Sequence, residues 1–296
     1  MANYGLPYMG SKNSLVEDII PRLPKAKNFY DLFCGGCSIT HGAMLSKKWE
    51  HFVINDINGE IPQLFLDSVH GKYRNEKRWI SREDFERLKD TDTYVSLCWS
   101  FGNNRKAYLY GKPIEPYKKA MHYAILFDDY SLLWALGINI SKQNGCKNYH
   151  EKRLKVTQAI KQYAKLKRTP ELQSLESLQS LESLQRLELH IGSYDEVEIK
   201  PDSVLYCDIP YENTAEYIGK GSGFDHKHFY DWACKQKELV VISSYDISDK
   251  RFQRVVNFKK NSLLNNNAAT KTQKNEGLFI PCDKLELWKT MKLRQQ

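Results

Sequence analysis

Two short motifs contain residue types that suit a nucleotide-like cofactor and a planar, amine-bearing substrate. The first reads Asp-Leu-Phe-Cys-Gly-Gly-Cys-Ser over residues 31–38, and the second reads Asp-Ile-Pro-Tyr over residues 208–211. Paired glycines let a backbone approach a ligand with no Cβ in the way. A helix that starts after such a turn points its first amides at a negative group, such as a carboxylate. On its own the first motif is a weak signal, because it lacks the full spacing of a dinucleotide-binding fingerprint.

The second motif predicts that an aromatic amine is held by its two N–H bonds. The Asp208 carboxylate and the Ile209 carbonyl are both acceptors, and an exocyclic amine has two donors to place. Pro210 lacks an N–H and fixes the turn, while Tyr211 offers a flat face to a ring. Holding both N–H bonds favours a nitrogen whose lone pair can attack a sulfonium methyl in line. A base inside a duplex must first be flipped out, and stacking on Tyr211 offsets part of that cost.

The sequence around the first motif predicts a parallel crossover. Residues 29–33 form a buried strand, Ser38 caps a helix over residues 39–47, and residues 51–55 form the next strand. That strand ends at Asp56, and a carboxylate at this place suits the two ribose hydroxyls of a nucleoside.

The rest of the chain predicts one α/β domain interrupted by a helical insert. Further helices are expected after Ser81 and over residues 115–127, 150–167 and 226–236, and further strands over residues 187–191, 203–207, 239–243, 252–258 and 277–280. We therefore expect an α/β domain made of residues 1–60 and 189–296, with the insert at residues 61–188.

One segment of the insert is low in complexity. Residues 172–187 carry leucine at every third position. An α-helix advances 3.6 residues per turn, so this repeat cannot keep one apolar seam. We interpret the segment as a helical connector, with a coiled-coil partner helix as the alternative.

Positive charge is concentrated in the insert. The net charge is +8, residues 115–168 hold eleven Lys and Arg against four Asp and Glu, and residues 259–274 hold four Lys and no acid. Clustered excess of this kind is typical of proteins that bind a phosphate backbone, although solvated helix faces are the alternative. Loops 103–106 and 141–147 are candidates for contacts to base edges. The residues expected to contact DNA are Arg105, Lys106, Lys118, Lys119, Lys152, Arg153 and Lys155.

With these motifs the chain resembles the Dam-like DNA adenine-N6 methyltransferases, the D12 class of the alpha group, and most of all their phage-borne members. The resemblance covers nearly the whole chain and adds Tyr-Met-Gly-Ser-Lys at 8–12 and Asn-Asp-Ile at 55–57 to the two motifs above. It implies a Rossmann-like methyltransferase fold with a mostly parallel seven-stranded sheet and a target-recognition insert. It also implies a site-specific enzyme that transfers a methyl group from S-adenosylmethionine to a flipped-out adenine of double-stranded DNA, alone or within a restriction-modification system.

The resemblance further implies the residues of the site. The catalytic residues are Asp208, Ile209, Pro210 and Tyr211. The cofactor-binding residues are Tyr8, Gly10, Lys12, Asp31, Phe33, Gly35, Asp56, Ile57, Tyr194 and Asp208. Lys12 is expected near the junction of cofactor and target base.

Two positions depart from the family pattern. Ile209 stands where the family usually has proline, but its expected role is that of a backbone carbonyl. Tyr194 is preceded by Ser193 and followed by Asp195, whereas the family often has Asp before the aromatic residue. This puts a carboxylate contact to the adenine of the cofactor in doubt.

Other functional classes fit these residues less well. Methylation of cytosine N4 would usually bring serine at position 208, and methylation of glutamine would bring asparagine. Lys12, Asp56 and Asp208 are all present, which favours an active enzyme over a methyltransferase fold that has lost its catalytic residues. A non-catalytic DNA-binding protein and an RNA adenine methyltransferase remain as alternatives.

Composition indicates the compartment and the absence of a metal. The seven cysteines are an odd number, and no signal peptide is evident, so we expect reduced thiols in the cytoplasm. No apolar run approaches the roughly 20 residues that span a bilayer, so no membrane is expected as a partner. Cys34, Cys37 and His41 lack a second pair of ligands at zinc spacing, which argues against a metal site. We expect a monomer or a weak dimer.

Overall fold

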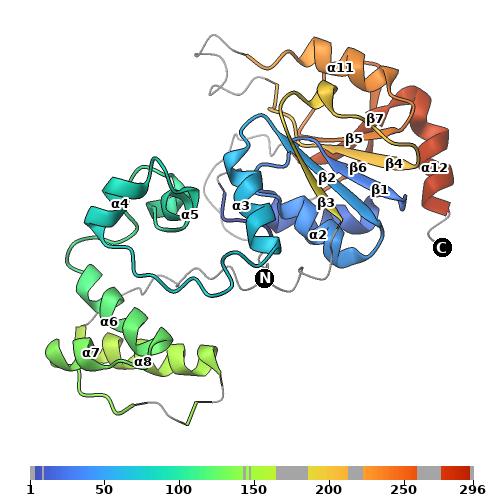
Figure 1. Cartoon of the computed structure of the whole chain (residues 1–296). Helices are drawn as coiled ribbons and strands as arrows, with labels where there is room; N and C mark the ends of the chain where they lie inside the picture. The colour runs from blue at the N-terminus through green and yellow to red at the C-terminus, as the bar shows by residue number, and fades with distance from the viewer. Residues whose placement is uncertain are drawn as a thin grey trace, which may run out of the picture. The chain divides into compact units, whose positions relative to one another are not determined.

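The computed structural model describes residues 4–8, 10–142, 145–146, 148–164, 186–212, 223–258 and 275–293, with side chains of helix α8 described to residue 161. The chain divides into two compact units (Figure 1). The first comprises Met1–Lys72 and Glu176–Gln296, and the second comprises Tyr73–Leu175. The second unit begins later than the predicted residue 61, because the helix over residues 60–69 packs on strands of the first unit. Of the leucine repeat at 172–187, residues 172–185 lie outside the described residues, and so does the basic segment 259–274.

The first unit is built on a seven-stranded sheet with the order β3-β2-β1-β4-β5-β7-β6. Neighbouring strands among the first five are parallel, and β7 runs antiparallel to both β5 and β6. The prediction of a mostly parallel, Rossmann-like sheet of seven strands is confirmed. The strands are β1 (Asn28–Asp31), β2 (His51–Asp56), β3 (Leu187–Ile191), β4 (Ser203–Cys207), β5 (Leu239–Ser244), β6 (Phe252–Asn257) and β7 (Gly277–Pro281).

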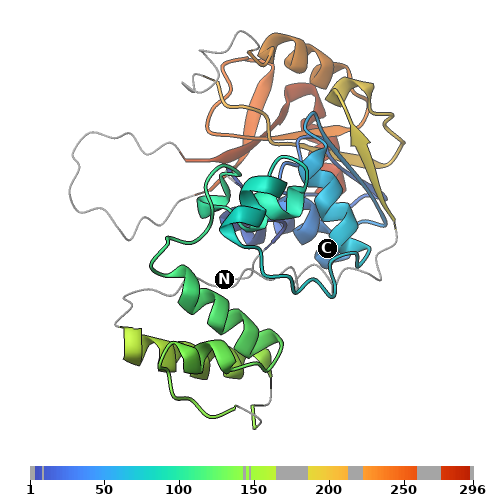
Figure 2. The ribbon, with the colours of Figure 1, turned by 60° about the vertical axis from the view of Figure 1, so that its left-hand side comes forward.

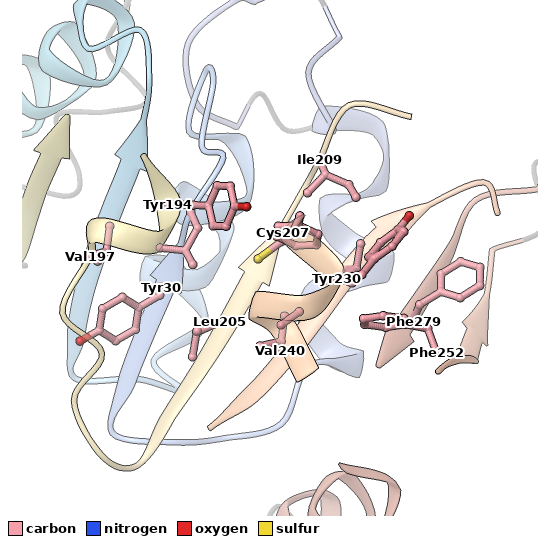
Figure 3. Packing of buried hydrophobic residues seen from close by; sticks show 14 of the residues in the cluster. Tyr30, Tyr194, Val197, Leu205, Cys207, Ile209, Tyr230, Val240, Phe252 and Phe279 are labelled. Carbon is pink, nitrogen blue, oxygen red and sulfur yellow. The ribbon is translucent and has the colours of Figure 1, made fainter. Parts of the chain in front are cut away.

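Helices cover both faces of this sheet because its central strands are apolar on both sides. Tyr30, Leu205 and Val240 lie in register on β1, β4 and β5, and Figure 3 shows them on one face. Phe229 and Ala233 of helix α11 (His226–Lys235) belong to the same buried cluster. Helices α2 (Ser38–Ser46) and α3 (Glu60–Val69) contact β1, β2 and β3. The other helices among the described residues of this unit are η1 (Asn13–Leu15), α1 (Val16–Ile19), η2 (Ile20–Arg22), η4 (Tyr194–Glu196), η5 (Cys282–Lys284) and α12 (Leu285–Leu293).

The turn between β1 and α2 differs in one detail from its prediction. Ser38 is the first residue of the helix rather than its cap, and Cys37 precedes it in the left-handed conformation with φ of 58°. No side-chain hydrogen bond caps this helix. The prediction of a Ser38 cap is therefore wrong, because the tight turn places Cys37 at the position where the chain enters the helix.

The second unit is helical over its described residues. Its elements are α4 (Arg82–Leu88), α5 (Thr93–Cys98), η3 (Phe101–Asn103), α6 (Glu115–Leu126), α7 (Ser131–Ala135) and α8 (Tyr149–Ala164). Ser81 caps α4 by accepting a hydrogen bond from the Asp84 amide, as its sequence predicts. Met121, Tyr130 and Val156 form part of the core between α6, α7 and α8. Figure 2 shows these helices from a second direction.

No helix within the described ranges is both long enough and apolar enough to cross a membrane.

Candidate active site

The carboxyl ends of parallel strands gather the predicted site residues at one edge of the sheet. Asp31 and Asp56 are the last residues of β1 and β2, and Asp208 follows β4 directly. Parallel strands end at the same edge, so these carboxylates lie near one another. Strand β7 runs the other way, and Gly277 pairs with Ser244 near the end of β5. The edge of the sheet therefore also receives the residue just before β7, which is Glu276.

Lys12 and Asp208 form the centre of the site. The Lys12 Nζ lies 2.7 Å from Asp208 Oδ1, and the side chains expose 8% and 21% of their areas. The same ammonium donates a 2.5 Å hydrogen bond to the Tyr211 hydroxyl. The exposed fraction of Asp208 leaves this carboxylate open to a further hydrogen bond. The structure thus brings together the lysine of the N-terminal motif and two residues of the motif predicted to be catalytic.

Glu276 is a member of this cluster that the sequence did not reveal. Its Oε1 lies 3.1 Å from Lys12 Nζ. The same oxygen accepts hydrogen bonds of 3.0 Å from the Tyr211 hydroxyl and 2.8 Å from the Ser243 hydroxyl. Both Glu276 and Ser243 are buried. No local pattern marks Glu276, because its place depends on a strand pairing rather than on a motif.

Burial and charge set the ionisation of the cluster. Burial raises the pKa of Asp208 to about 6; Lys12 opposes this rise, and the Glu276 carboxylate adds to it. Burial alone would lower the pKa of Lys12, but Asp208 and Glu276 outweigh it and raise that pKa. Burial, followed by the negative charge of Asp208, raises the pKa of Tyr211. At neutral pH the lysine is therefore cationic, the tyrosine is neutral and Asp208 is mostly ionised.

A residue of α11 contacts the backbone of the Asp-Ile-Pro-Tyr motif at residues 208–211. His226 Nε2 lies 2.8 Å from the Pro210 carbonyl oxygen, which requires the proton on that nitrogen. The Ile209 side chain is buried in the core (Figure 3), so its apolar side chain anchors the turn where the family has proline. The Tyr211 ring lies 4.5 Å from the Tyr245 ring, measured between centroids. His226 and Tyr245 are further residues that the sequence did not indicate.

Asp31 presents a buried acceptor beside these groups. Its Oδ2 accepts a 2.6 Å hydrogen bond from Thr40, whereas the described residues supply no partner for its Oδ1. Burial raises the pKa of Asp31 to about 7, against the hydrogen bond from Thr40; the charges of Asp208 and Asp56 add to the rise. A buried acceptor without a partner is costly, so this atom indicates where a donor from a ligand would bind.

Asp56 fixes the glycine turn from the neighbouring strand. Its Oδ2 accepts a 2.9 Å hydrogen bond from the Gly35 amide, and its Oδ1 accepts one of 2.9 Å from the Asn58 amide. A Cβ on Gly36 would lie 2.6 Å from Tyr8 Cβ, so glycine is needed there for the N-terminal segment to pass. The Tyr8 ring lies over Gly35 and keeps 37% of its area exposed.

The other predicted cofactor residues differ in exposure. The Phe33 and Tyr194 rings lie 5.3 Å apart between centroids, and Tyr194 is buried (Figure 3). Gly10 has φ of 83° and open space where a Cβ would be. Ile57 exposes 84% of its area. Asp195 follows Tyr194, whereas the family often has an Asp before the aromatic residue. Its carboxylate lies 3.0 Å from His228 Nε2.

Lys118 corrects the predicted DNA-binding set. Its side chain is 2% exposed and lies 6.0 Å from the Tyr110 ring centroid. Burial lowers the pKa of Lys118 to about 8, and Arg153 and Lys161 add to this. On α6, Lys118 lies one turn before Met121 and two turns before Ile125, which are core residues. The prediction of an exposed phosphate contact at this position is therefore wrong.

The remaining basic residues of the set lie at or near the surface. Lys106 and Lys119 are exposed, and Arg153 is half-buried. Lys152 and Lys155 form ion pairs of 2.6 Å with Asp128 and 2.9 Å with Glu151. Arg105 is half-buried, and its Nε donates a 3.2 Å hydrogen bond to Ser96. Of the candidate base-reading loop 141–147, Gln143, Asn144 and Lys147 lie outside the described residues.

Within the described ranges, no group of three or more His, Cys, Asp or Glu side chains could hold a metal ion.

Comparison with known proteins identifies a family. A model of the D12 class N6 adenine-specific DNA methyltransferases matches residues 8–270. No curated protein matches the chain. Among solved structures, the rRNA methyltransferase AviRa from Streptomyces viridochromogenes is 10% identical, with a TM-score of 0.42, over 95% of this chain and 89% of that one. A likeness at this distance supports no conclusion about activity.

Proposed function

The chain belongs to the D12 class N6 adenine-specific DNA methyltransferases, and we propose that it transfers the methyl group of S-adenosylmethionine to an adenine held by Asp208 and Tyr211. The observation that carries this proposal is the joint position of the Asp208 carboxylate and the Tyr211 hydroxyl, both within 2.7 Å of Lys12 Nζ. The acceptor and the ring that the chemistry needs come from one motif.

The residues around Asp31 and Asp56 fit the proposed cofactor. Asp31 Oδ1, for which the described part of the chain supplies no partner, suits the α-ammonium group. The Asp56 carboxylate suits the ribose hydroxyls, because each of its oxygens has a second lone pair beyond its amide contact. Phe33, with its ring beside Tyr194, suits the adenine ring. Tyr8, Gly10 and Ile57 are exposed near these positions in the sequence and complete the proposed set. When bound, S-adenosylmethionine supplies an electrophilic methyl group on a sulfonium.

Asp208 and Ile209 act on the amine of the target adenine. The Asp208 carboxylate accepts a hydrogen bond from one N–H group of the amine, and the Ile209 carbonyl accepts a hydrogen bond from the other. This arrangement localises the lone pair on N6. As N6 bonds to the methyl carbon, the carbon–sulfur bond breaks and its electron pair stays on sulfur, which leaves as a neutral thioether. The amine becomes positively charged, the Asp208 carboxylate stabilises that charge, and the amine then loses one N–H proton to solvent. Pro210, with its carbonyl oxygen near His226, keeps the Ile209 carbonyl in place. The ring of Tyr211 stacks on the adenine and offsets part of the cost of flipping it out.

We further propose that the second unit binds double-stranded DNA. Lys106, Lys119 and Arg153 supply charge for phosphates, as do Lys152 and Lys155 through the outer sides of their ion pairs. Arg105 is the candidate for a base edge, because a guanidinium can make two hydrogen bonds to guanine. Ser96 holds part of this side chain, which orients it before binding.

Methyl transfer from labelled S-adenosylmethionine tests this proposal. Duplex DNA without adenine methylation, the same DNA as single strands, and RNA are offered separately, and the digested nucleosides are separated. We expect label in N6-methyldeoxyadenosine from the duplex. Label confined to RNA would favour the RNA alternative, and duplex binding without any label would favour the non-catalytic one.

A further inference from the structure

We infer that Glu276 is a positioning residue of the methyl-transfer site, holding Lys12 and Tyr211 in place from strand β7. This inference rests on the proposed function. Residue 276 lies beyond the residues 8–270 that the family model matches. Its assignment therefore comes from the structure, where one oxygen of Glu276 meets groups from three other parts of the chain.

The contacts of Glu276 connect the two halves of the site. Lys12 comes from the N-terminal segment, Tyr211 from the loop after β4, and Ser243 from β5. All three contact Glu276 Oε1, at 3.1, 3.0 and 2.8 Å. A side chain that is buried and joined in this way has little freedom to move. Glu276 therefore fixes the Tyr211 hydroxyl, and with it the plane of the ring on which the adenine stacks.

Charge gives Glu276 a second effect. Lys12 alone would neutralise Asp208, because the two form a 2.7 Å ion pair. With Glu276 the cluster holds one cation and two carboxylates, and the Lys12 ammonium divides its attraction between them. Glu276 raises the pKa of Asp208, but at neutral pH, where Asp208 is mostly ionised, the cluster as a whole carries net negative charge beside the amine. An amine that gains positive charge during attack is better stabilised by this net negative cluster.

Glu276→Gln tests the charge while keeping the size and one acceptor oxygen. We expect the single-turnover rate of methyl transfer to fall about tenfold or more, since a hydrogen bond to a charged group contributes about 1.5–3 kcal/mol. S-adenosylmethionine affinity should stay within about twofold. The titratable groups that face Asp208 are Lys12, Glu276, Tyr211, the carboxyl of Asp31, the Tyr206 hydroxyl and the Cys207 thiol. Losing the negative charge of Glu276 lowers the pKa of Asp208, so the acid limb of the rate profile should move to lower pH.

Two companion variants keep the test decisive. Glu238→Gln is the matched control, because Glu238 Oε2 accepts a 3.1 Å hydrogen bond from the Ser203 amide at the opposite edge of the sheet. It should leave rate and pH profile unchanged. Ser243→Ala removes one donor to Glu276 and keeps its charge, and should slow transfer by about three- to tenfold. This variant decides the matter if Glu276→Gln does not fold.

The outcomes separate this inference from the proposed function. A wild-type protein that makes no N6-methyladenine would contradict the proposed function itself. If the wild type is active, a Glu276→Gln or Ser243→Ala protein with the wild-type rate would overturn the role of Glu276. A slower Glu276→Gln protein whose acid limb has not moved would also overturn it, because a purely structural loss leaves the pKa of Asp208 in place.

Discussion

Gly35 and Asp56 are joined by a 2.9 Å hydrogen bond from the Gly35 amide to Asp56 Oδ2. The carboxylate that we assign to the ribose thus also holds the glycine turn at the end of β1. Strand pairing brings them together, since Asp31 and Ile54 are partners in the register of β1 and β2. One side chain on β2 therefore organises both sides of the proposed cofactor site.

Asp56→Ala should weaken binding of S-adenosylmethionine by about 1–3 kcal/mol, because it leaves ribose hydroxyls and the Gly35 amide without their acceptor. Asp56→Asn keeps one oxygen for the amide and should lose less. Calorimetric titration measures both. Asp67→Ala, which removes a carboxylate paired with Lys72, is the control. A folded Asp56→Ala protein with wild-type affinity would remove Asp56 from the site.

Cofactor affinity should increase with pH through about 7. Burial raises the pKa of Asp31 to about 7, and an ammonium group binds its ionised form. Below this pH the carboxyl must lose a proton before it binds the cation, so affinity should be about tenfold weaker at pH 6 than at pH 8. Asp31→Asn should bind weakly with a flatter profile. Titrations at several pH values check this, and identical profiles for both proteins would exclude Asp31 as the acceptor.

Neighbouring lysines on α6 should differ in their effect on DNA binding. Lys119 is exposed and Lys118 is buried. Lys119→Gln should weaken binding to all DNA sequences and lower the slope of log affinity against log salt by about 0.9, the value for one phosphate contact. Lys118→Gln should leave that slope unchanged. Equal slopes for wild type and Lys119→Gln would show that this surface of the helix does not face DNA.

Arg105→Ala should relax the choice of sequence more than it weakens binding. A good contact to a base is worth about 1–3 kcal/mol of discrimination. Methylation of a library of random duplexes, followed by sequencing of the modified sites, measures the preference. Arg87, which pairs with Asp84 on α4, provides the control substitution Arg87→Ala. An unchanged preference after Arg105→Ala would assign base reading to other residues.

The strands of the sheet could be predicted from the sequence because apolar patterns and turn residues are visible within short stretches of the chain. The strands at 187–191 and 203–207 have the predicted bounds, since an alternating apolar pattern in the first and an apolar run in the second each end at turn residues. The carboxylates Asp31, Asp56 and Asp208 could be predicted as site residues for the same reason, because each stands at or just after the end of a buried strand.

The features that the sequence did not predict depend on contacts between distant parts of the chain. Glu276 reaches the site through the antiparallel pairing of β7 with β5, which no motif encodes. Lys118 looks like a surface residue in the sequence, but its helix phase turns it under Tyr110. Cys37 takes the left-handed conformation that glycine usually adopts, and the turn that imposes it is set by the packing around the helix start.

The central claim is that Asp208 holds the adenine amine during transfer. Mass spectrometry of nucleosides from DNA incubated with S-adenosylmethionine and either wild-type or Asp208→Ala protein tests it most directly. We predict N6-methyldeoxyadenosine with the wild type and none with the variant, while cofactor binding by the variant falls much less. N4-methylcytosine in place of N6-methyladenine, or equal N6-methyladenine from both proteins, would contradict the claim.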